Sequence, residues 1–277
     1  MARPPRINLP NVPQHIVQVG HNNMPCFFDD ADYAFYLESL KIAADQYQVD
    51  VHAYVLLPKA IQLVATPRIA TAIPSMMQSV GRRYVQYINH RYQRSGTLWG
   101  GRYKSSLIDS SSYLISCYRY VELRPMYLNL VDGPEAYQWS SYHHHALGKT
   151  SHLIKDHRLY SELGDTQAER ANKYSESFLY AFDQRLMKYI AETISVGQIL
   201  GGDKFKTKIE EVSQVRLRPK KRGRPKKVVV EVAEKLEETV NSESTNLESQ
   251  TSNLKPQTSN LKPQTSNLKP QTSNLES

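Results

Sequence analysis

The first 149 residues predict an α/β sandwich in which helices cover one face of a single, mainly antiparallel sheet. Two observations lead to this fold class. Apolar residues recur with a period of two in short stretches and with a helical period in longer ones. These stretches alternate in the order β-α-β-β-α-β-α, which is typical of a small two-layer domain. Residues 150–212 follow a helical period and predict a smaller helical appendage.

The first half of this domain contains three predicted strands and one helix. The strands cover residues 14–20, 49–57 and 60–66, and the helix covers residues 29–48. Asp29 or Asp30 can cap the helix. Its apolar stripe consists of Tyr33, Tyr36, Leu37, Leu40 and Ala44. Alternation from Val49 to Leu57 predicts that the apolar residues of this strand share one face, and Pro58 ends it.

The second half contains a long helix, a strand and a third helix. Residues 71–96 predict a helix that stops at Gly96. Residues 97–109 predict a loop and a strand. Residues 111–125 predict a helix that Ser111 or Ser112 caps and that Pro125 stops.

Cysteine usage and hydropathy bear on the compartment. The chain has two cysteines, Cys26 and Cys117, without a CxxC pair, which suggests a reducing cytoplasm and excludes a zinc ribbon or a disulfide framework. The N-terminus has no apolar segment of the signal-peptide kind, and no run approaches the roughly 18 apolar residues of a membrane span. We therefore expect a cytoplasmic protein, associated with the nucleoid, that does not bind membranes.

The positive charge is concentrated in one short segment. The net charge of the chain is +8, and residues 213–227 alone hold eight Lys and Arg and no acidic residue. A compact basic run of this kind favours a polyanionic partner. We therefore predict a basic segment at residues 213–230.

Residues 231–277 differ in composition from everything before them. The heptad TSNLKPQ occurs three times from Thr251, and a partial copy closes the chain. A coiled coil needs apolar residues at two heptad positions and does not tolerate a proline in each repeat. We expect a disordered, low-complexity tail here.

Several segments, in this order along the chain, resemble one family. They are MARPPRI, MPCFFDDADYAFYL, VHAYVLLP, GRYKSSLID, SSYLISCYRYVELRP, WSSYHHHALG, LGGDKFKTKIEE and RPKKRGRPKK. The family is that of the single-tyrosine transposases with a His-hydrophobic-His motif, and the most similar branch is the one associated with repetitive extragenic palindromes. The resemblance covers roughly residues 1–227.

The resemblance implies a ferredoxin-like fold and chemistry on single-stranded or hairpin DNA. In such enzymes a tyrosine hydroxyl attacks a backbone phosphate and forms a covalent 5′-phosphotyrosine. Two histidines of a central strand and a polar residue on the tyrosine's helix hold Mg²⁺ or Mn²⁺, which polarises the phosphate. These spacings are physically reasonable, because residues i and i+2 share a face of a strand and residues i and i+4 share a face of a helix.

This chain departs from the family's motif at all the metal-ligand positions. The nucleophile position, Tyr120, is retained, and Ile61 keeps the hydrophobic position of the strand motif. Ala60 and Gln62 stand where the family has histidines, Lys59 stands where it has asparagine, and Arg124 replaces the polar residue of the helix. Alanine has no donor atom, an amide oxygen is a weak ligand, and the cation of Arg124 repels a divalent ion. We therefore predict no metal cofactor and little or no cleavage, since the Lewis acid is missing.

Other readings of these residues stay open. Arg124 could neutralise the phosphate in place of a metal, as arginine does at many phosphate sites. His15 and His52 could serve as replacement ligands, although a lone histidine in a strand is more often a packed or surface residue. The run His143–His145 follows WSSY in an expected turn, and we interpret it as able to catch a metal adventitiously rather than as a site.

The basic segment contains a sequence that looks like an AT-hook. Its core consists of Arg222, Gly223, Arg224 and Pro225. An extended Gly-Arg-Pro segment fits the narrow, strongly negative minor groove of A·T-rich duplex. The flanking residues expected to contact phosphates are Lys220, Lys221, Lys226 and Lys227. A generic basic tail that binds any nucleic acid is the alternative.

Two further segments interleave aromatic and basic residues in the way that single-strand binding requires. The candidate DNA-binding residues are Arg82, Arg83, Arg91, Trp99, Arg102, Tyr103 and Lys104. The alternative is that the aromatic side chains, including Tyr84, belong to the core and that the arginines form a solvated face.

The function we predict from the sequence is DNA binding by a transposase-family protein that cleaves DNA poorly or not at all. Active relatives carry out transposition by single-strand cleavage and strand transfer. A domesticated regulator or architectural protein, for which DNA binding is the whole activity, is the second hypothesis. A decayed relic without a selected role is the third.

Overall fold

The computed structural model describes residues 6–215, which contain one four-stranded antiparallel sheet. Its strands are β1 (Gln14–Val19), β2 (Val49–Leu57), β3 (Ala60–Pro67) and β4 (Lys104–Leu107). The spatial order is β2-β3-β1-β4, and each neighbouring pair is antiparallel. With one helix between β1 and β2 and another between β3 and β4, this is the ferredoxin-like arrangement, so the predicted fold class is confirmed.

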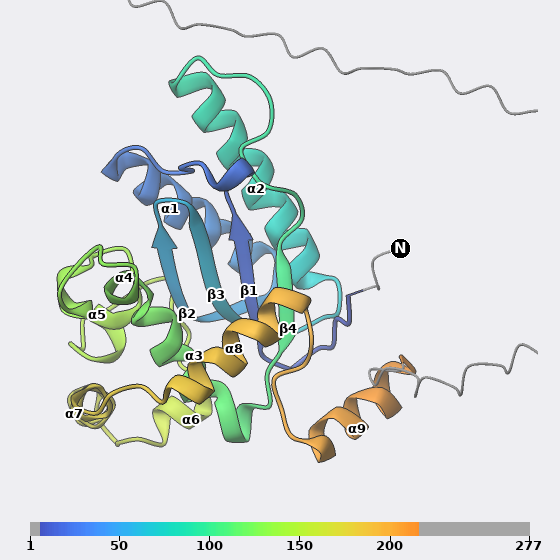
Figure 1. Cartoon of the computed structure of the whole chain (residues 1–277), viewed down its shortest axis with the longest axis vertical. Helices are drawn as coiled ribbons and strands as arrows, with labels where there is room; N and C mark the ends of the chain where they lie inside the picture. The colour runs from blue at the N-terminus through green and yellow to red at the C-terminus, as the bar shows by residue number, and fades with distance from the viewer. Residues whose placement is uncertain (1–5, 216–277) are drawn as a thin grey trace, which may run out of the picture. The chain divides into compact units, whose positions relative to one another are not determined.

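The α-helices follow the chain from α1 to α9 (Figure 1). Their bounds are α1 Asp30–Tyr47, α2 Ala72–Arg91, α3 Ser110–Glu122, α4 Arg124–Tyr127, α5 Tyr142–His145, α6 Arg158–Ser161, α7 Gln167–Glu176, α8 Gln184–Val196 and α9 Asp203–Ser213. Short 3-10 helices lie at His21–Asn23, Pro134–Ala136 and Ser177–Leu179. No described helix is long and apolar enough to cross a membrane.

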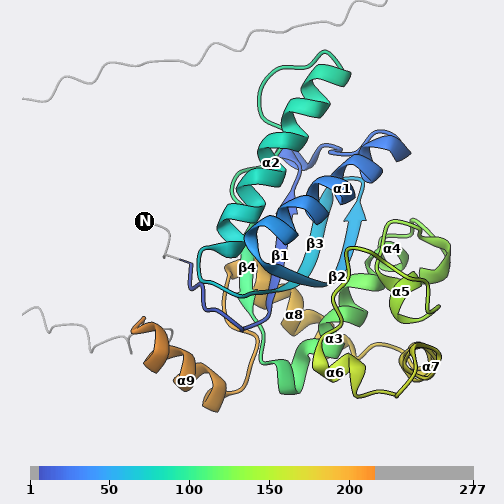
Figure 2. The same ribbon diagram turned by 180° about the vertical axis from the view of Figure 1, so that it is seen from behind.

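Helices cover both faces of the sheet, not one face as the sequence predicted. Helices α1 and α2 pack on one face, around Ile16, Ile61 and Leu63 (Figure 2). Helices α3 and α8 lie on the opposite face, seen in front of the sheet in Figure 1. There Ala53 and Val64 join Leu114 and Val121 in a second core. The second layer arises because the strands are apolar on both sides of the sheet.

The helix boundaries agree with the predicted ones where local side chains fix them. Asp29 caps α1 through a reciprocal pair of hydrogen bonds with Asp32, and so confirms one of the two predicted caps. The cap position of α3 is Asp109 rather than Ser111 or Ser112, and α3 ends before Pro125, which lies in the first turn of α4. These differences of one to three residues leave the face that α3 presents to the sheet unchanged.

Helix α2 ends at Arg91 rather than at Gly96. The residues that follow leave the helical path, since Gln93 has a φ of 50° and Gly96 has a φ of 87°. The side chain of Asn89 donates a hydrogen bond to the carbonyl of Gly96 and holds the segment after α2 against the helix. Glycine therefore marks the turn after the helix rather than the helix end itself.

A β-bulge in β2 overturns the prediction that all its apolar residues share one face. Val51 pairs with Ala65, and Ala53 pairs with the adjacent Val64, so His52 is an extra residue between the two pairs. Val51 consequently packs with α1 and α2, whereas Ala53 packs with α3. One inserted residue interrupts the alternation of side chains between the two faces of the strand.

The segment after α5 contributes to the second core. Tyr160, Tyr174, Phe182 and Ile190 are buried with residues of α3, and α8 packs on β4 and β1. Helices α6 to α9 lie in this segment. Except for residues 213–215, the predicted basic segment and the repeat tail lie outside the described residues.

Candidate site around Tyr120

Helix α3 directs Tyr120 toward the sheet, and Arg124, four residues later at the start of α4, lies beside it. The tyrosine is 4% exposed and belongs to the second core. The guanidinium carbon of Arg124 lies 5.6 Å from the centroid of the Tyr120 ring. The pair predicted from the i, i+4 spacing is therefore in contact.

Strand β3 presents Ala60 and Gln62 to the α3 side and buries Ile61 on the other side. Ile61 packs with α1 and α2, whereas the half-buried Ala60 packs against the core that contains Tyr120. The alternation expected for the strand motif is therefore present. We call the group formed by His15, Ala60, Gln62, Tyr120 and Arg124 the Tyr120 site.

His15 of β1, one of the two histidines considered as replacement ligands, joins this site. In the register of β1 and β3, Val17 lies opposite Gln62, so His15 is a diagonal neighbour of Gln62. Its Nε2 lies 3.0 Å from Gln62 Oε1. Its ring meets the Tyr120 ring edge to face, with centroids 5.7 Å apart. Only the strand register, which the sequence does not state, could have identified this contact.

Burial controls the protonation of the site. It lowers the pKa of His15 to about 4, although the hydrogen bond that His15 donates to Gln62 raises this pKa, and the charge of Arg124 lowers it further. Burial also raises the pKa of Tyr120, and the charge of Arg124 only partly offsets it. At neutral pH the site therefore holds a neutral imidazole and a neutral phenol, which is a weak nucleophile.

The Tyr120 site does not fit the divalent metal that the family resemblance implies. Ala60 offers no donor atom, and the Gln62 oxygen already accepts the His15 hydrogen bond. Arg124 adds a positive charge where a cation would have to bind. A hard divalent ion such as Mg²⁺ requires several free oxygen ligands, which this group does not supply.

His52, the other histidine considered as a replacement ligand, is engaged elsewhere. Its Nδ1 lies 2.6 Å from the Lys155 carbonyl, and its Nε2 lies 2.8 Å from the Thr66 hydroxyl. Burial lowers its pKa to about 4. It is a packed histidine of the β2 bulge.

Among the candidate DNA-binding residues, three arginines are available to solvent. Arg82 and Arg83 on α2 and Arg102 before β4 are exposed and form no ion pair within the described part of the chain. Arg91 is instead paired with Asp29 and Asp32. Lys104 Nζ donates a hydrogen bond to the Ser195 carbonyl at 2.8 Å.

The two aromatic candidates do not lie on the surface. Trp99 and Tyr103 are each 7% exposed and pack in the α1–α2 core with Tyr84. Arg6 lies over the Tyr103 ring, 3.9 Å from its centroid, and covers it further. These rings are therefore unavailable for base stacking in this conformation, contrary to the prediction. The AT-hook residues, from Lys220 to Lys227, lie outside the described residues.

Comparison with known proteins finds a family model that the domain carrying this site resembles. The family model described as IS200-like transposase matches residues 8–124. Among solved structures, a REP-associated tyrosine transposase bound to a REP hairpin aligns with a TM-score of 0.47 and 13% identity over 57% of this chain and 93% of that chain. A Deinococcus radiodurans R1 protein assigned as a transposase aligns with a TM-score of 0.30 and 17% identity over 43% of this chain and 94% of that chain. No curated protein sequence matches the chain.

The family match covers all four strands, the helices between them and the helix that bears Tyr120. It ends at Arg124, so it contains every residue of the Tyr120 site. The domain that carries the Tyr120 site is therefore similar to the IS200-like transposase family.

Proposed function

We propose that this chain is a DNA-binding protein of the transposase family whose Tyr120 site does not carry out metal-dependent strand cleavage. The observation that carries the proposal is the hydrogen bond between His15 and Gln62. It occupies the one ligand oxygen that the strand motif retains, next to Ala60, which has none. Without a Lewis acid, the transition state for attack on a phosphate loses several kcal/mol of stabilisation.

Electrostatics supports DNA as the partner. Arg82, Arg83 and Arg102 are exposed and are not paired with carboxylates among the described residues, so their guanidinium groups are free to contact phosphates. The segment 213–227 adds eight basic residues without an acid. We infer that the domain binds single-stranded or hairpin DNA and that the Arg222–Pro225 core binds A·T-rich duplex.

Covalent adduct formation tests the catalytic part of the proposal. Labelled hairpin oligonucleotides from the sequences that flank the gene are incubated with Mn²⁺ and the full chain. A restored variant with Lys59→Asn, Ala60→His, Gln62→His and Arg124→Asn is run beside it, and its matched control carries Tyr120→Phe in addition. We expect label only on the restored variant, and none on its Tyr120→Phe control.

Label on the natural chain that disappears in Tyr120→Phe would show that the site works with its substituted residues. That result would overturn the inactivity proposed here. It would also favour the alternative in which Arg124 neutralises the phosphate.

Fluorescence anisotropy tests DNA binding separately from catalysis. If the basic segment makes about six phosphate contacts, log K should fall with log[salt] with a slope near −5 on duplex DNA. Deleting residues 213–227 should remove most of this dependence. If Arg82→Ala with Arg83→Ala does not weaken hairpin binding by the deletion variant, the domain has no DNA-binding role of its own, as a relic would behave.

A further inference from the structure

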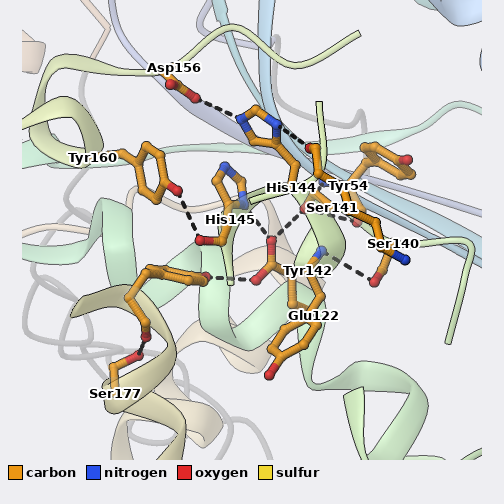
Figure 3. A network of polar contacts seen from close by, with 12 residues as sticks. Tyr54, Glu122, Ser140, Ser141, Tyr142, His144, His145, Asp156, Tyr160 and Ser177 are labelled. Atoms are coloured by element: carbon orange, nitrogen blue, oxygen red, sulfur yellow. Dashed lines mark hydrogen bonds and ion pairs between the residues drawn. The ribbon is translucent and has the colours of Figure 1, made fainter. Parts of the chain in front are cut away.

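A second polar cluster lies on the other side of α3, around the histidines that follow the WSSY segment (Figure 3). It comprises Glu122, Ser141, His144, His145, Asp156 and Tyr174, and we call it the Glu122 network. It is separate from the Tyr120 site, since no residue is shared. Its members come from α3, from α5 and its N-cap residue Ser141, from α7 and from the loop before α6.

Glu122 organises the buried half of this network. Its carboxylate has no exposed surface and has three partners: the Ser141 hydroxyl at 2.6 Å, the Tyr174 hydroxyl at 2.7 Å and His145 Nδ1 at 2.6 Å. A carboxylate accepts, so Nδ1 of His145 donates. The neutral ring then carries its lone pair on Nε2.

That lone pair has no partner. His145 is 0% exposed, and its Nε2 makes no hydrogen bond within the described residues. In Figure 3 this free ring nitrogen is directed toward the side on which His144 and Asp156 lie. A buried, unpaired nitrogen next to two potential ligands calls for an explanation, because an unmade bond in the interior is costly.

His144 repeats the same pattern nearer the surface. Its Nδ1 lies 3.1 Å from the Lys149 carbonyl, which can only accept, so Nδ1 donates. Its Nε2 then faces Asp156 Oδ1 at 2.9 Å. A lone pair that faces a carboxylate oxygen requires a positive charge between them. That charge is either a proton on the ring or a metal ion.

We propose that His144, His145 and Asp156 form a binding site for Zn²⁺ or a similar divalent transition metal. One ligand atom from each residue lies within 4.8 Å of the other two. In a tetrahedral site with bonds of about 2 Å, donors lie about 3.3 Å apart, so small side-chain movements bring these three onto one ion. Each histidine donates its second ring N–H to an oxygen of Glu122 or Lys149, as metal-binding histidines do.

The donor set favours zinc over magnesium. Two imidazole nitrogens and one carboxylate suit a borderline-soft ion, whereas Mg²⁺ takes oxygen ligands. The side chain of Asp156 is 26% exposed and that of His144 is 11% exposed, so an ion has a route from solvent. A water molecule would complete four-coordination. The ion would join α5 to the loop before α6.

The test uses the full chain, purified without a histidine tag and stripped of metal. Zn²⁺ binding is measured by calorimetry, and Co²⁺ is added separately to record the visible spectrum of a tetrahedral site. We expect one ion per chain and the Co²⁺ bands of tetrahedral coordination. His144→Gln and Asp156→Asn should each weaken binding by at least tenfold, with an unchanged far-ultraviolet circular dichroism spectrum.

The neighbouring His143 provides the matched control. Its Nε2 lies 2.8 Å from the Glu135 carbonyl, outside the proposed ligand set. His143→Gln should bind Zn²⁺ like the natural chain. If His143→Gln weakens binding as much as His144→Gln does, or if the folded natural chain binds less than one ion, the histidine run only captures metal adventitiously and the proposal fails.

Discussion

Two polar pairs at the same spacing start from α3, and they differ in how completely their polar groups are satisfied. Tyr120 and Arg124 face the sheet, where the tyrosine hydroxyl makes no hydrogen bond within residues 6–215. Tyr118 and Glu122 face α5, where the Tyr118 ring stacks on His145 with centroids 5.0 Å apart and Glu122 has three partners. Helix α3 thus contributes to two sites: the Tyr120 site, which lacks metal ligands, and the Glu122 network, which contains the proposed ones.

The difference shows that keeping the fold of a site and keeping its chemistry are separate matters. The strand and helix geometry of the Tyr120 site persists because apolar packing on both sides of the sheet maintains it. The chemistry depends on individual polar atoms, which packing does not protect. The predictions below measure how much each side of α3 contributes to stability.

The largest effect is expected from Glu122→Ala. It leaves His145, Ser141 and Tyr174 without their buried acceptor, and we expect a loss of about 3–5 kcal/mol in the free energy of unfolding. Urea denaturation measures it, with Glu38→Ala on the exposed side of α1 as a control expected to stay within about 0.5 kcal/mol. Equal effects in both variants would mean that the network adds no stability.

The next effect is a pH dependence that originates at the Tyr120 site. Burial holds the pKa of His15 at about 4, below its ordinary value of 6.5, so the unfolded chain binds the extra proton between these values. Stability should be full above pH 6.5 and fall by on the order of 3 kcal/mol as the pH drops to 4. His15→Gln should flatten the profile in this window. If the slope of stability against pH is unchanged in His15→Gln, groups other than His15 cause the pH dependence.

A slightly smaller effect is expected from zinc on the opposite side of the helix. At a free concentration one hundred times its Kd, Zn²⁺ should raise the free energy of unfolding by about 2.7 kcal/mol. Thermal denaturation of the full chain, with and without Zn²⁺, measures the gain. At the same Zn²⁺ concentration, Asp156→Asn should cut the gain to about 1.4 kcal/mol or less, and His143→Gln should keep it. Stabilisation that survives Asp156→Asn would place the ion elsewhere.

The smallest effect is expected from Tyr120→Phe. The hydroxyl has no hydrogen-bond partner within the described residues, so its removal should change stability by less than about 0.5 kcal/mol. The same denaturation experiment as for Glu122→Ala makes the two sides of α3 directly comparable. A loss above 1 kcal/mol would show that the Tyr120 hydroxyl is bonded in solution.

The order of strands and helices could be predicted from the sequence because periodic apolar residues report local structure directly. The same reasoning placed Ile61 on one face and Gln62 on the other, as the structure confirms. It failed at β2 because one extra residue, His52, changes the faces without changing the composition of the strand. Likewise, nothing local distinguishes a Trp99 that stacks on bases from one that is buried.

The candidate site was only partly predictable, since its residues come from separate elements. The proximity of Tyr120 and Arg124 could be inferred from their spacing of four residues, although Arg124 begins a new helix, α4. The contact between His15 and Gln62 depends on the register of two strands far apart in the sequence. The Glu122 network depends on where α5 packs against the rest of the domain. The run His143–His145 alone did not show that only two of its members point inward.

The bulge in β2 has a consequence beyond the sheet. Because His52 is the inserted residue, deleting it would restore an unbroken ladder and leave every other side chain of β2 on its present face. What would be lost is an anchor: the His52 ring holds the Lys155 carbonyl, and Asp156 follows directly. We expect such a deletion to fold with both cores intact and with faster amide exchange around Lys155. A single inserted residue in a strand thus anchors a loop that is distant in the sequence.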